Sequence, residues 1–441
     1  MFASWLNRSG LGRPELRAWA MYDWANSAFM TTIIAGVFPI YFASVAAADL
    51  PGDVATVRFS TVTTISLLCV AVMAPILGAV ADYAAVKMKM LAGFLALGVI
   101  ATGAMFFIER GDWLLAALLF GLGNIGASGS FVFYDALLPH LAAPDEIDRV
   151  STAGYALGYV GGGLLLAVNL AWIQAPALFG IDGPDTAARL SFLSVAIWWL
   201  GFSIPLFRHV SEPARTVERD ERPGAGSIRA AFTRLGETLG ELRGYRQAFL
   251  MLLAFLVYND GINTIIRMAT IYGTQIGIDR GSLIAALLLT QFIGIPFAFM
   301  FGGLASRIGP KSSIFLSLAV YLVISVLGYF MSTPLHFFTL AILVGTVQGG
   351  SQALSRSLFA SMIPRHKSGE FFGFFAVFEK FAGIAGPALF GLTAALTGSS
   401  RYAILSVITF FVVGGALLAL VDVDAGRRAA RSADLDVQVV A

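Results

Sequence analysis

Twelve long apolar runs dominate the sequence and restrict the fold more than any other feature. Each is close to the roughly 20 residues that an α-helix needs to cross a bilayer. The runs are too long for membrane β-strands and do not alternate as such strands do. We therefore predict an all-α membrane protein with twelve transmembrane helices. The expected spans are 18–43, 58–81, 90–108, 113–138, 151–173, 188–207, 246–273, 282–304, 313–331, 336–362, 371–396 and 402–421.

The composition excludes several other classes of protein. Only 13% of the residues are charged, whereas soluble domains carry about 25%. A net charge of +2 gives no case for a nucleic-acid partner. The single cysteine, Cys69, allows no disulfide and no cysteine metal site, and no paired-histidine motif is present. No nucleophile and base stand at a recognisable spacing, so we expect no metal, no cofactor and no enzymatic activity.

The longest polar gap divides the twelve spans into six and six. It predicts three parts: an N-terminal bundle over 1–207, a linker over 208–245, and a C-terminal bundle with a short tail over 246–441. Residues 227–243 within the linker have the pattern of an amphipathic surface helix. The first apolar run contains Asp23 and Asn26, so we interpret it as a retained helix and not as a cleaved signal.

Positive charge predicts the orientation in the membrane. With both ends of the chain in the cytoplasm, 21 of the 29 Lys and Arg residues are cytoplasmic and five lie in outer loops. This asymmetry follows the positive-inside rule. Arg outnumbers Lys 24 to 5, which is typical of GC-rich bacterial genomes. We therefore expect a multi-pass protein of a bacterial inner membrane.

A loop motif repeats in the two halves with an offset of 224 residues. A constant offset indicates two related halves of parallel topology. The residues that define the repeat are Gly78, Asp82 and Lys87 in the first copy, and Gly302, Arg307, Gly309 and Lys311 in the second.

The second copy also has a superficial likeness to a phosphate-binding loop. Pro310 separates Gly309 from Lys311, however, so the required Gly-Lys pair is broken, and no strand precedes it. We expect no ATP binding, and any pumping must draw on a gradient.

Polar side chains concentrate on the first, fourth, seventh and tenth spans. A charged group at bilayer depth is costly and normally faces protein or a water-filled cavity. At 100° per residue, these side chains form one stripe on each of the four helices, which predicts a shared central cavity. The candidate residues for substrate binding or coupling are Asp23, Asn26, Asn124, Asp135, Asn259, Asp260, Asn263, Gln348, Gln352 and Arg356, together with Glu379 on the eleventh span.

Structural roles are the alternative interpretation for several of the charged residues at bilayer depth. Asp23 and Asp135 can cap neighbouring helices, Arg267 can snorkel to the outer headgroups, and Glu379 and Lys380 can form a structural ion pair. The glycines that recur along 154–162 favour close helix packing, with a sliding surface as the other interpretation.

The two loop copies resemble the Gly-x-x-x-Asp-Arg/Lys-x-Gly-x-Arg/Lys motif of the major facilitator superfamily, which implies that both act as gating loops. Three segments resemble the autophagy-related vacuole effluxer family more closely: YDWANSAF (22–29), GYALGYVGGG (154–163) and YNDGINTI (258–265). This resemblance covers essentially the whole chain. It implies two six-helix bundles whose first, fourth, seventh and tenth helices line the substrate path. It also implies export of an amino acid.

The leading hypothesis is a secondary transporter that moves a small solute by alternating access, and the resemblance implies that the solute is an amino acid. Arg356 can bind a carboxylate, and Asp23 or Asp260 can face an ammonium group. Coupling to protons is an open option through Asp23, Asp135, Asp260 or Glu379, because a buried carboxyl group can titrate. The expected partners are a small-molecule substrate, the lipid bilayer and protons. The alternatives are an exporter of a hydrophobic or drug-like solute and a non-transporting membrane scaffold or receptor.

Overall fold

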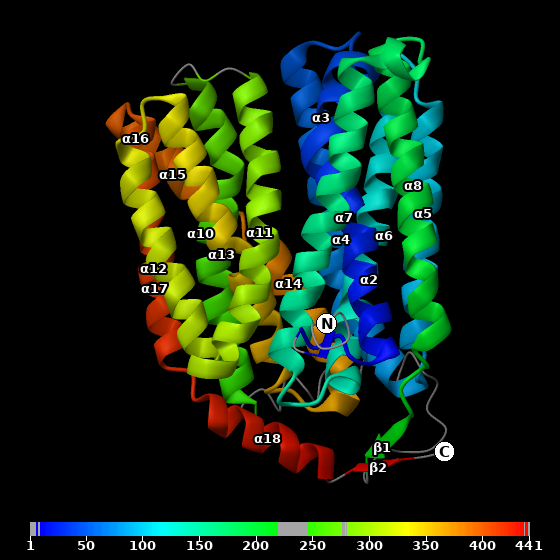
Figure 1. The fold of residues 1–441 in the computed structure, drawn as a ribbon, viewed down its shortest axis with the longest axis vertical. Coiled ribbons are helices and arrows are strands. Elements are labelled where there is room, and N and C mark those ends of the chain that lie inside the picture. Colours follow the sequence, from blue (N-terminus) through cyan, green and yellow to red (C-terminus); the bar gives the residue numbers. More distant parts are fainter. Residues whose placement is uncertain are drawn as a thin grey trace.

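The computed structural model of the chain describes residues 6–7, 9–218, 245–275, 278, 280–435 and 437–439. Within them, twelve helices are long and apolar enough to cross a membrane. They stand side by side in two bundles (Figure 1). The predicted all-α fold with twelve spans is therefore confirmed. The amphipathic helix that the sequence predicts at 227–243 lies outside the described residues.

The first bundle holds the first six spans. The first span is irregular, because two π-helical stretches flank the short α3, which contains Pro39; proline cannot continue a regular helical hydrogen-bond ladder. The elements are α2 (Pro14–Ala28), η1 (Phe29–Gly36), α3 (Val37–Tyr41), η2 (Phe42–Ala46), α4 (Gly52–Ala84), α5 (Lys87–Ala104), η3 (Met105–Phe107), α6 (Trp113–Leu141), α7 (Ile147–Gln174), η4 (Pro176–Phe179) and α8 (Pro184–His209).

The second bundle holds the other six spans, and two of them are interrupted. Its elements are α10 (Arg246–Gln275), α11 (Arg280–Ile308), α12 (Pro310–Tyr329), α13 (Pro334–Ala360), η5 (Arg365–Lys367), α14 (Ser368–Phe381), α15 (Ala385–Thr397), α16 (Ser400–Ser406) and α17 (Ile408–Ala419). The sequence predicts one helix over 371–396, whereas the structure has a break between α14 and α15. Gly383 lies in this break with φ +110°, a conformation that favours glycine.

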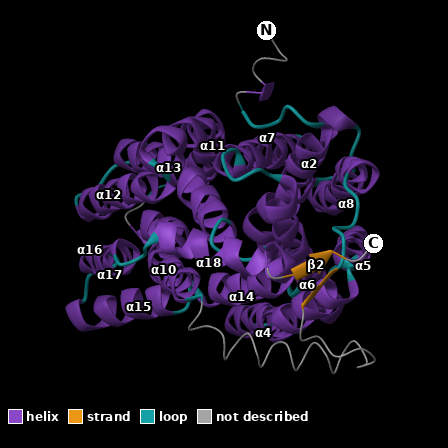
Figure 2. Ribbon diagram, turned by 90° about the horizontal axis from the view of Figure 1, so that it is seen from below, coloured by secondary structure: helices purple, strands orange, loops and turns teal. Residues whose placement is uncertain are grey.

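The two bundles meet along several helices of each. α4 packs against α14, and α7 packs against α11 and α13. The view along the bundles shows the two groups of helices lying side by side (Figure 2). We call the end that carries the start of α2, the end of α8 and the start of α10 the terminal end, and the other the opposite end (Figure 1).

A strap formed by the last part of the chain crosses the terminal end. The sequence predicts a short tail here, whereas the structure adds α18 (Val423–Leu435) and β2 (Val437–Val439). α18 contacts α10 and η5 of the second bundle, and β2 pairs antiparallel with β1 (Thr216–Glu218), which follows α8 of the first bundle. Figure 1 shows α18 lying across the base of the helices. The strap therefore touches segments that belong to both bundles.

Candidate functional site

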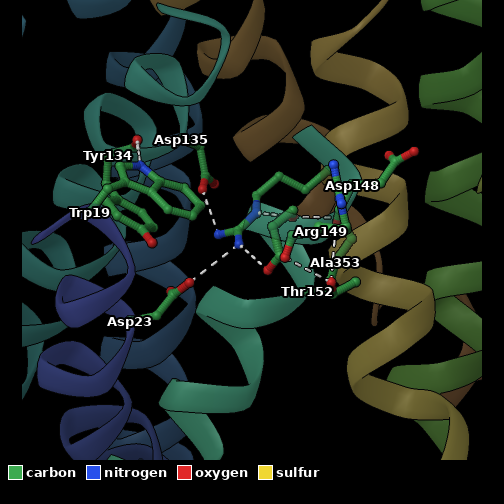
Figure 3. Close-up of polar contacts among 10 residues, drawn as sticks. Trp19, Asp23, Tyr134, Asp135, Asp148, Arg149, Thr152 and Ala353 are labelled. Carbon is green, nitrogen blue, oxygen red and sulfur yellow. Dashed lines mark hydrogen bonds and ion pairs between the residues drawn. The ribbon is translucent and has the colours of Figure 1, made fainter. Parts of the chain in front are cut away.

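One buried arginine joins the two bundles near the terminal end. Arg356 extends from α13, and its Nη1 and Nη2 atoms pair with Asp135 Oδ1 on α6 at 3.0 Å and Asp23 Oδ2 on α2 at 3.2 Å. Its Nε donates to Ser151 Oγ on α7 at 2.9 Å, and Nη2 also donates to the Ser151 carbonyl at 3.0 Å (Figure 3). Two expected acidic residues and the expected basic residue thus form one network, which connects four helices.

Three aromatic rings surround the same guanidinium. Its Cζ atom lies 4.8 Å from the ring centroid of Trp19, 5.7 Å from that of Tyr134 and 4.6 Å from that of Tyr155. Cations within about 6 Å of an aromatic face are attracted to its π electrons. The rings therefore stabilise the positive charge where water is excluded.

The burial of this cluster makes its ion pairs energetically important. The side chain of Arg356 is 3% exposed, against 9% for Asp23 and 13% for Asp135. Removing one member of a buried pair leaves an unpaired charge, which costs about 3–5 kcal/mol. Two carboxylates also face a single guanidinium, so the three groups carry one surplus negative charge. One proton on either carboxyl group would neutralise the cluster.

Further hydrogen bonds join the bundles around this cluster. Ser151 Oγ donates to the Ala353 carbonyl at 2.7 Å, and Ser357 Oγ donates to Asp148 Oδ1 at 2.6 Å. His140 Nε2 and Ser368 Oγ lie 3.0 Å apart. These contacts tie α6 and α7 of the first bundle to α13 and α14 of the second.

The first predicted gating loop forms another contact between the bundles. Asp82 Oδ1 and Oδ2 accept hydrogen bonds from the backbone N–H groups of Gly369 at 3.1 Å and Glu370 at 2.8 Å. These groups belong to the first turn of α14, whose free N–H groups attract a carboxylate. Lys87 Nζ pairs with Asp82 Oδ1 at 2.5 Å. A Cβ atom on Gly78 would lie 2.1 Å from the Gly369 carbonyl oxygen, so the two backbones meet directly.

The second predicted gating loop behaves differently. Lys311 Nζ donates to the carbonyl groups of Ala419 and Val421 at 2.9 and 2.7 Å, within its own bundle. Ser306 stands where Asp82 would be, and its hydroxyl donates to the Gly303 carbonyl. A Cβ on Gly302 would lie 2.3 Å from Thr152 Oγ1 of α7. In this copy the glycine again lies close to a helix of the other bundle, but the capping carboxylate is missing. Arg307 is exposed, and Gly309 precedes α12 with φ +85°.

Asp260 lies in a second polar cluster, at the break between α14 and α15. Its carboxylate accepts from the N–H groups of Gly383 at 2.8 Å, Ala385 at 3.1 Å and Gly386 at 3.0 Å. Asn263 Nδ2 donates to the Ala382 carbonyl at 3.4 Å. The side chain expected to share a cavity with Arg356 therefore satisfies backbone groups that the helix break leaves without helical partners.

Arg267 completes the cluster at this break. Its Nη1 donates to the Gly383 carbonyl at 3.4 Å. Pro387, four residues later, has no N–H to offer this carbonyl, as a regular helix would require. Arg267 therefore supplies the donor that proline cannot.

The remaining candidates occupy less connected positions. Asn124 is buried and its Oδ1 accepts from Ser128 at 3.4 Å. Glu379 is paired with Lys380 at 3.5 Å, in agreement with the structural alternative. The other candidates are Asn26 and Asn259, which are buried, and Gln348 and Gln352, which are half-buried.

Sequence reasoning missed several residues of the Arg356 network. Ser151 and the rings of Trp19, Tyr134 and Tyr155 were not among the candidates. Trp19 precedes Asp23 by four residues, so both share one face of α2, and this spacing is a signal that points to Trp19. Ser151 and Tyr155 carry no comparable signal, because their role depends on how α7 meets α13.

The hydrogen bonds that join the bundles in the described part of the chain lie in the half nearer the terminal end. They involve residues 82 of α4, 140 of α6, 148–151 of α7, 353–357 of α13 and 368–370 of α14. The structure therefore represents a state in which the terminal end is closed.

Solved structures with the same arrangement are transporters. An outward-conformation structure of the major facilitator superfamily transporter FucP matches with a TM-score of 0.68 at 15% identity, covering 94% of this chain and 99% of that one. A bacterial homologue of the iron transporter ferroportin, in an outward-facing state, matches with a TM-score of 0.64 at 14% identity and covers 92% and 98%. The fold is that of a major facilitator superfamily transporter.

Sequence relatives narrow this class. The chain is 39% identical to the Bacillus subtilis protein described as uncharacterized MFS-type transporter YxiO, over 92% of this chain and 94% of the relative. It is 23% identical to autophagy-related protein 22-1 of Penicillium rubens, over 88% and 79%. Residues 51–431 match the family described as "Vacuole effluxer Atg22 like", and the chain belongs to that family. The resemblance predicted from the sequence is confirmed.

Proposed function

We propose that this transporter moves a neutral amino acid, or a zwitterion of similar size, by alternating access. The observation that carries the proposal is the Arg356 network. A positive group of the second bundle meets negative groups of the first bundle in a buried cluster. A solute that bears both charges can satisfy both sides when the bundles separate. The names of the effluxer relatives support the direction of export.

The same cluster supports coupling to protons. One proton on Asp23 or Asp135 would neutralise the surplus negative charge and weaken the hold on Arg356. Since the ion pairs close the terminal end, protonation and opening would be linked. The surplus of positive charge on the terminal side supports a cytoplasmic position for that side in a bacterial inner membrane.

The test begins with a thermal-shift screen of the purified protein against amino acids. Any hit is then measured by counterflow in proteoliposomes, and by accumulation driven by an imposed pH gradient. We expect the wild-type protein to accumulate the hit when the imposed gradient supplies protons, and equal uptake with and without the gradient would contradict proton coupling. Transport of hydrophobic cations with no response to any zwitterion would contradict the proposed substrate class.

A further inference from the structure

The site that holds the Arg356 guanidinium is built almost entirely on one bundle. Its carboxylates and rings come from α2, α6 and α7 of the first bundle, and only Arg356 itself comes from the second. Figure 3 shows four of the first-bundle residues, Trp19, Asp23, Tyr134 and Asp135. We call this set the ammonium box; its members are Trp19, Asp23, Tyr134, Asp135 and Tyr155. The first bundle thus carries a complete cation site, and the second supplies a cation tethered to its own backbone.

Contacts inside the first bundle hold part of the ammonium box in place without Arg356. The Trp19 indole Nε1 donates to the Tyr134 carbonyl at 3.0 Å, and the two rings stack with centroids 4.5 Å apart. The ring of Tyr22 also packs against Tyr134, with centroids 4.8 Å apart. The orientation of these rings does not depend on the second bundle, so this wall of the box remains when the bundles part.

Space for a cation beside Asp23 depends on one glycine. A Cβ on Gly154 would lie 2.4 Å from Asp23 Oδ2, 3.1 Å from the Trp19 ring and 3.3 Å from Arg356 Nη2. The backbone of α7 can therefore approach the carboxylate and the cation only because no side chain stands there. Close packing against α2 explains Gly158, Gly161 and Gly162 further along α7, whereas Gly154 also borders the box.

We propose that the ammonium box is the binding subsite for the positively charged nitrogen of the substrate, and that Arg356 occupies it as a stand-in in the closed state. The inference rests on the proposed function and extends it to an assigned subsite. Aromatic faces combined with carboxylates suit an ammonium group as well as a guanidinium.

Charge pairing explains why the ligand must be a zwitterion. When its ammonium group enters the box, the displaced Arg356 takes the carboxylate of the same molecule. Each bundle then keeps a partner of opposite charge, and the net charge of the cluster is the same as in the closed state. A simple amine would leave Arg356 without a counter-charge, and a simple acid would leave the box without one. Binding of a zwitterion therefore replaces the direct link between the bundles.

Three small probes of similar size test this assignment. Alanine carries both charges, ethylammonium carries only the positive charge, and propionate carries only the negative charge. Their binding to purified protein is measured by titration of the intrinsic tryptophan fluorescence. We expect the wild-type protein to bind alanine more tightly than either of the others. In Arg356→Ala the box is vacant and no guanidinium meets the carboxylate, so ethylammonium should become the best of the three ligands.

A second substitution tests the aromatic wall. In the Arg356→Ala background, Tyr155→Leu should weaken ethylammonium binding roughly tenfold, because one cation–π contact is lost. The matched control is Tyr402→Leu, which removes an exposed tyrosine from α16 and should leave binding unchanged. If Arg356→Ala does not fold, Arg356→Gln retains most of the side-chain volume, and Tyr155→Leu in the otherwise wild-type protein should weaken alanine binding but not propionate binding.

The outcomes separate this inference from the proposed function. A folded Arg356 variant that does not bind ethylammonium saturably, or equal effects of Tyr155→Leu and Tyr402→Leu, would overturn the ammonium box. Absence of alanine counterflow in wild-type proteoliposomes, combined with ethylammonium binding to Arg356→Ala, would instead reject the transport of this zwitterion and support the cation site.

Discussion

Asp82 provides the sharpest test of the closed terminal end, because its carboxylate on one bundle caps a helix of the other. Asp82→Asn keeps the shape of the side chain but replaces one acceptor oxygen by an NH2 group and removes the charge. Two charge-assisted hydrogen bonds to Gly369 and Glu370 are weakened or lost. We take the loss as about 2 kcal/mol, which changes the ratio of closed to open molecules by a factor of about 30.

The assay measures how fast a buried cysteine reacts with a water-soluble thiol reagent. Ala353 is fully buried and its carbonyl accepts from Ser151, so Ala353→Cys in a Cys69→Ser background reacts only when the terminal end opens. At limiting reagent, the rate follows the population of the open state. We expect Asp82→Asn to react about 30 times faster than its parent, as the free energy above requires.

A matched control lies in the other copy of the loop. Ser306 occupies the corresponding position, but its hydroxyl bonds only within its own helix. Ser306→Ala should therefore react at the parental rate. Equal rates for Asp82→Asn and its parent, with unchanged thermal stability, would refute the conclusion that this carboxylate holds the terminal end closed.

Three further changes address other contacts. Gly78→Ala places a methyl group 2.1 Å from the Gly369 carbonyl oxygen and should speed the same cysteine reaction. Its control, Gly93→Ala, has nothing within 4 Å of the new methyl group and should not change the rate. Equal reaction rates for the two variants would contradict the close approach of the backbones at Gly78. Asp260→Asn should lower Tm by a few degrees, since about 2 kcal/mol of capping is lost, and an unchanged Tm in a calorimetric scan would show that the break needs no cap. Truncation after Asp422 removes the strap and should also speed the cysteine reaction; an unaltered rate would show that the strap does not hold the terminal end.

The helices were predictable because bilayer thickness and backbone hydrogen bonding leave few choices for long apolar runs. The break in the eleventh span was not predicted, although Gly383 and Pro387 supply the necessary local signals. Hydropathy averages over such residues. A pair of a glycine and a proline four residues apart is the better indicator of a broken helix.

The candidate site was predicted as a set of residues but not as a set of contacts. Charge at bilayer depth identifies Asp23, Asp135, Asp260 and Arg356 as functional or structural. Which of them meet depends on how the bundles dock. Asp260 serves a helix break within its own bundle, whereas the other three join across the interface, and no helical periodicity distinguishes these two arrangements.

The unequal contribution of the two bundles to the ammonium box has a consequence for how substrate selectivity can change. The first bundle contributes every group of the proposed ammonium subsite, and the second contributes the one arginine that would take the carboxylate. A chimaera that joins the first bundle of one relative to the second bundle of another should therefore inherit its preference among ammonium compounds from the first parent. Diversification of the solute can proceed in half of the molecule while the other half is left unaltered.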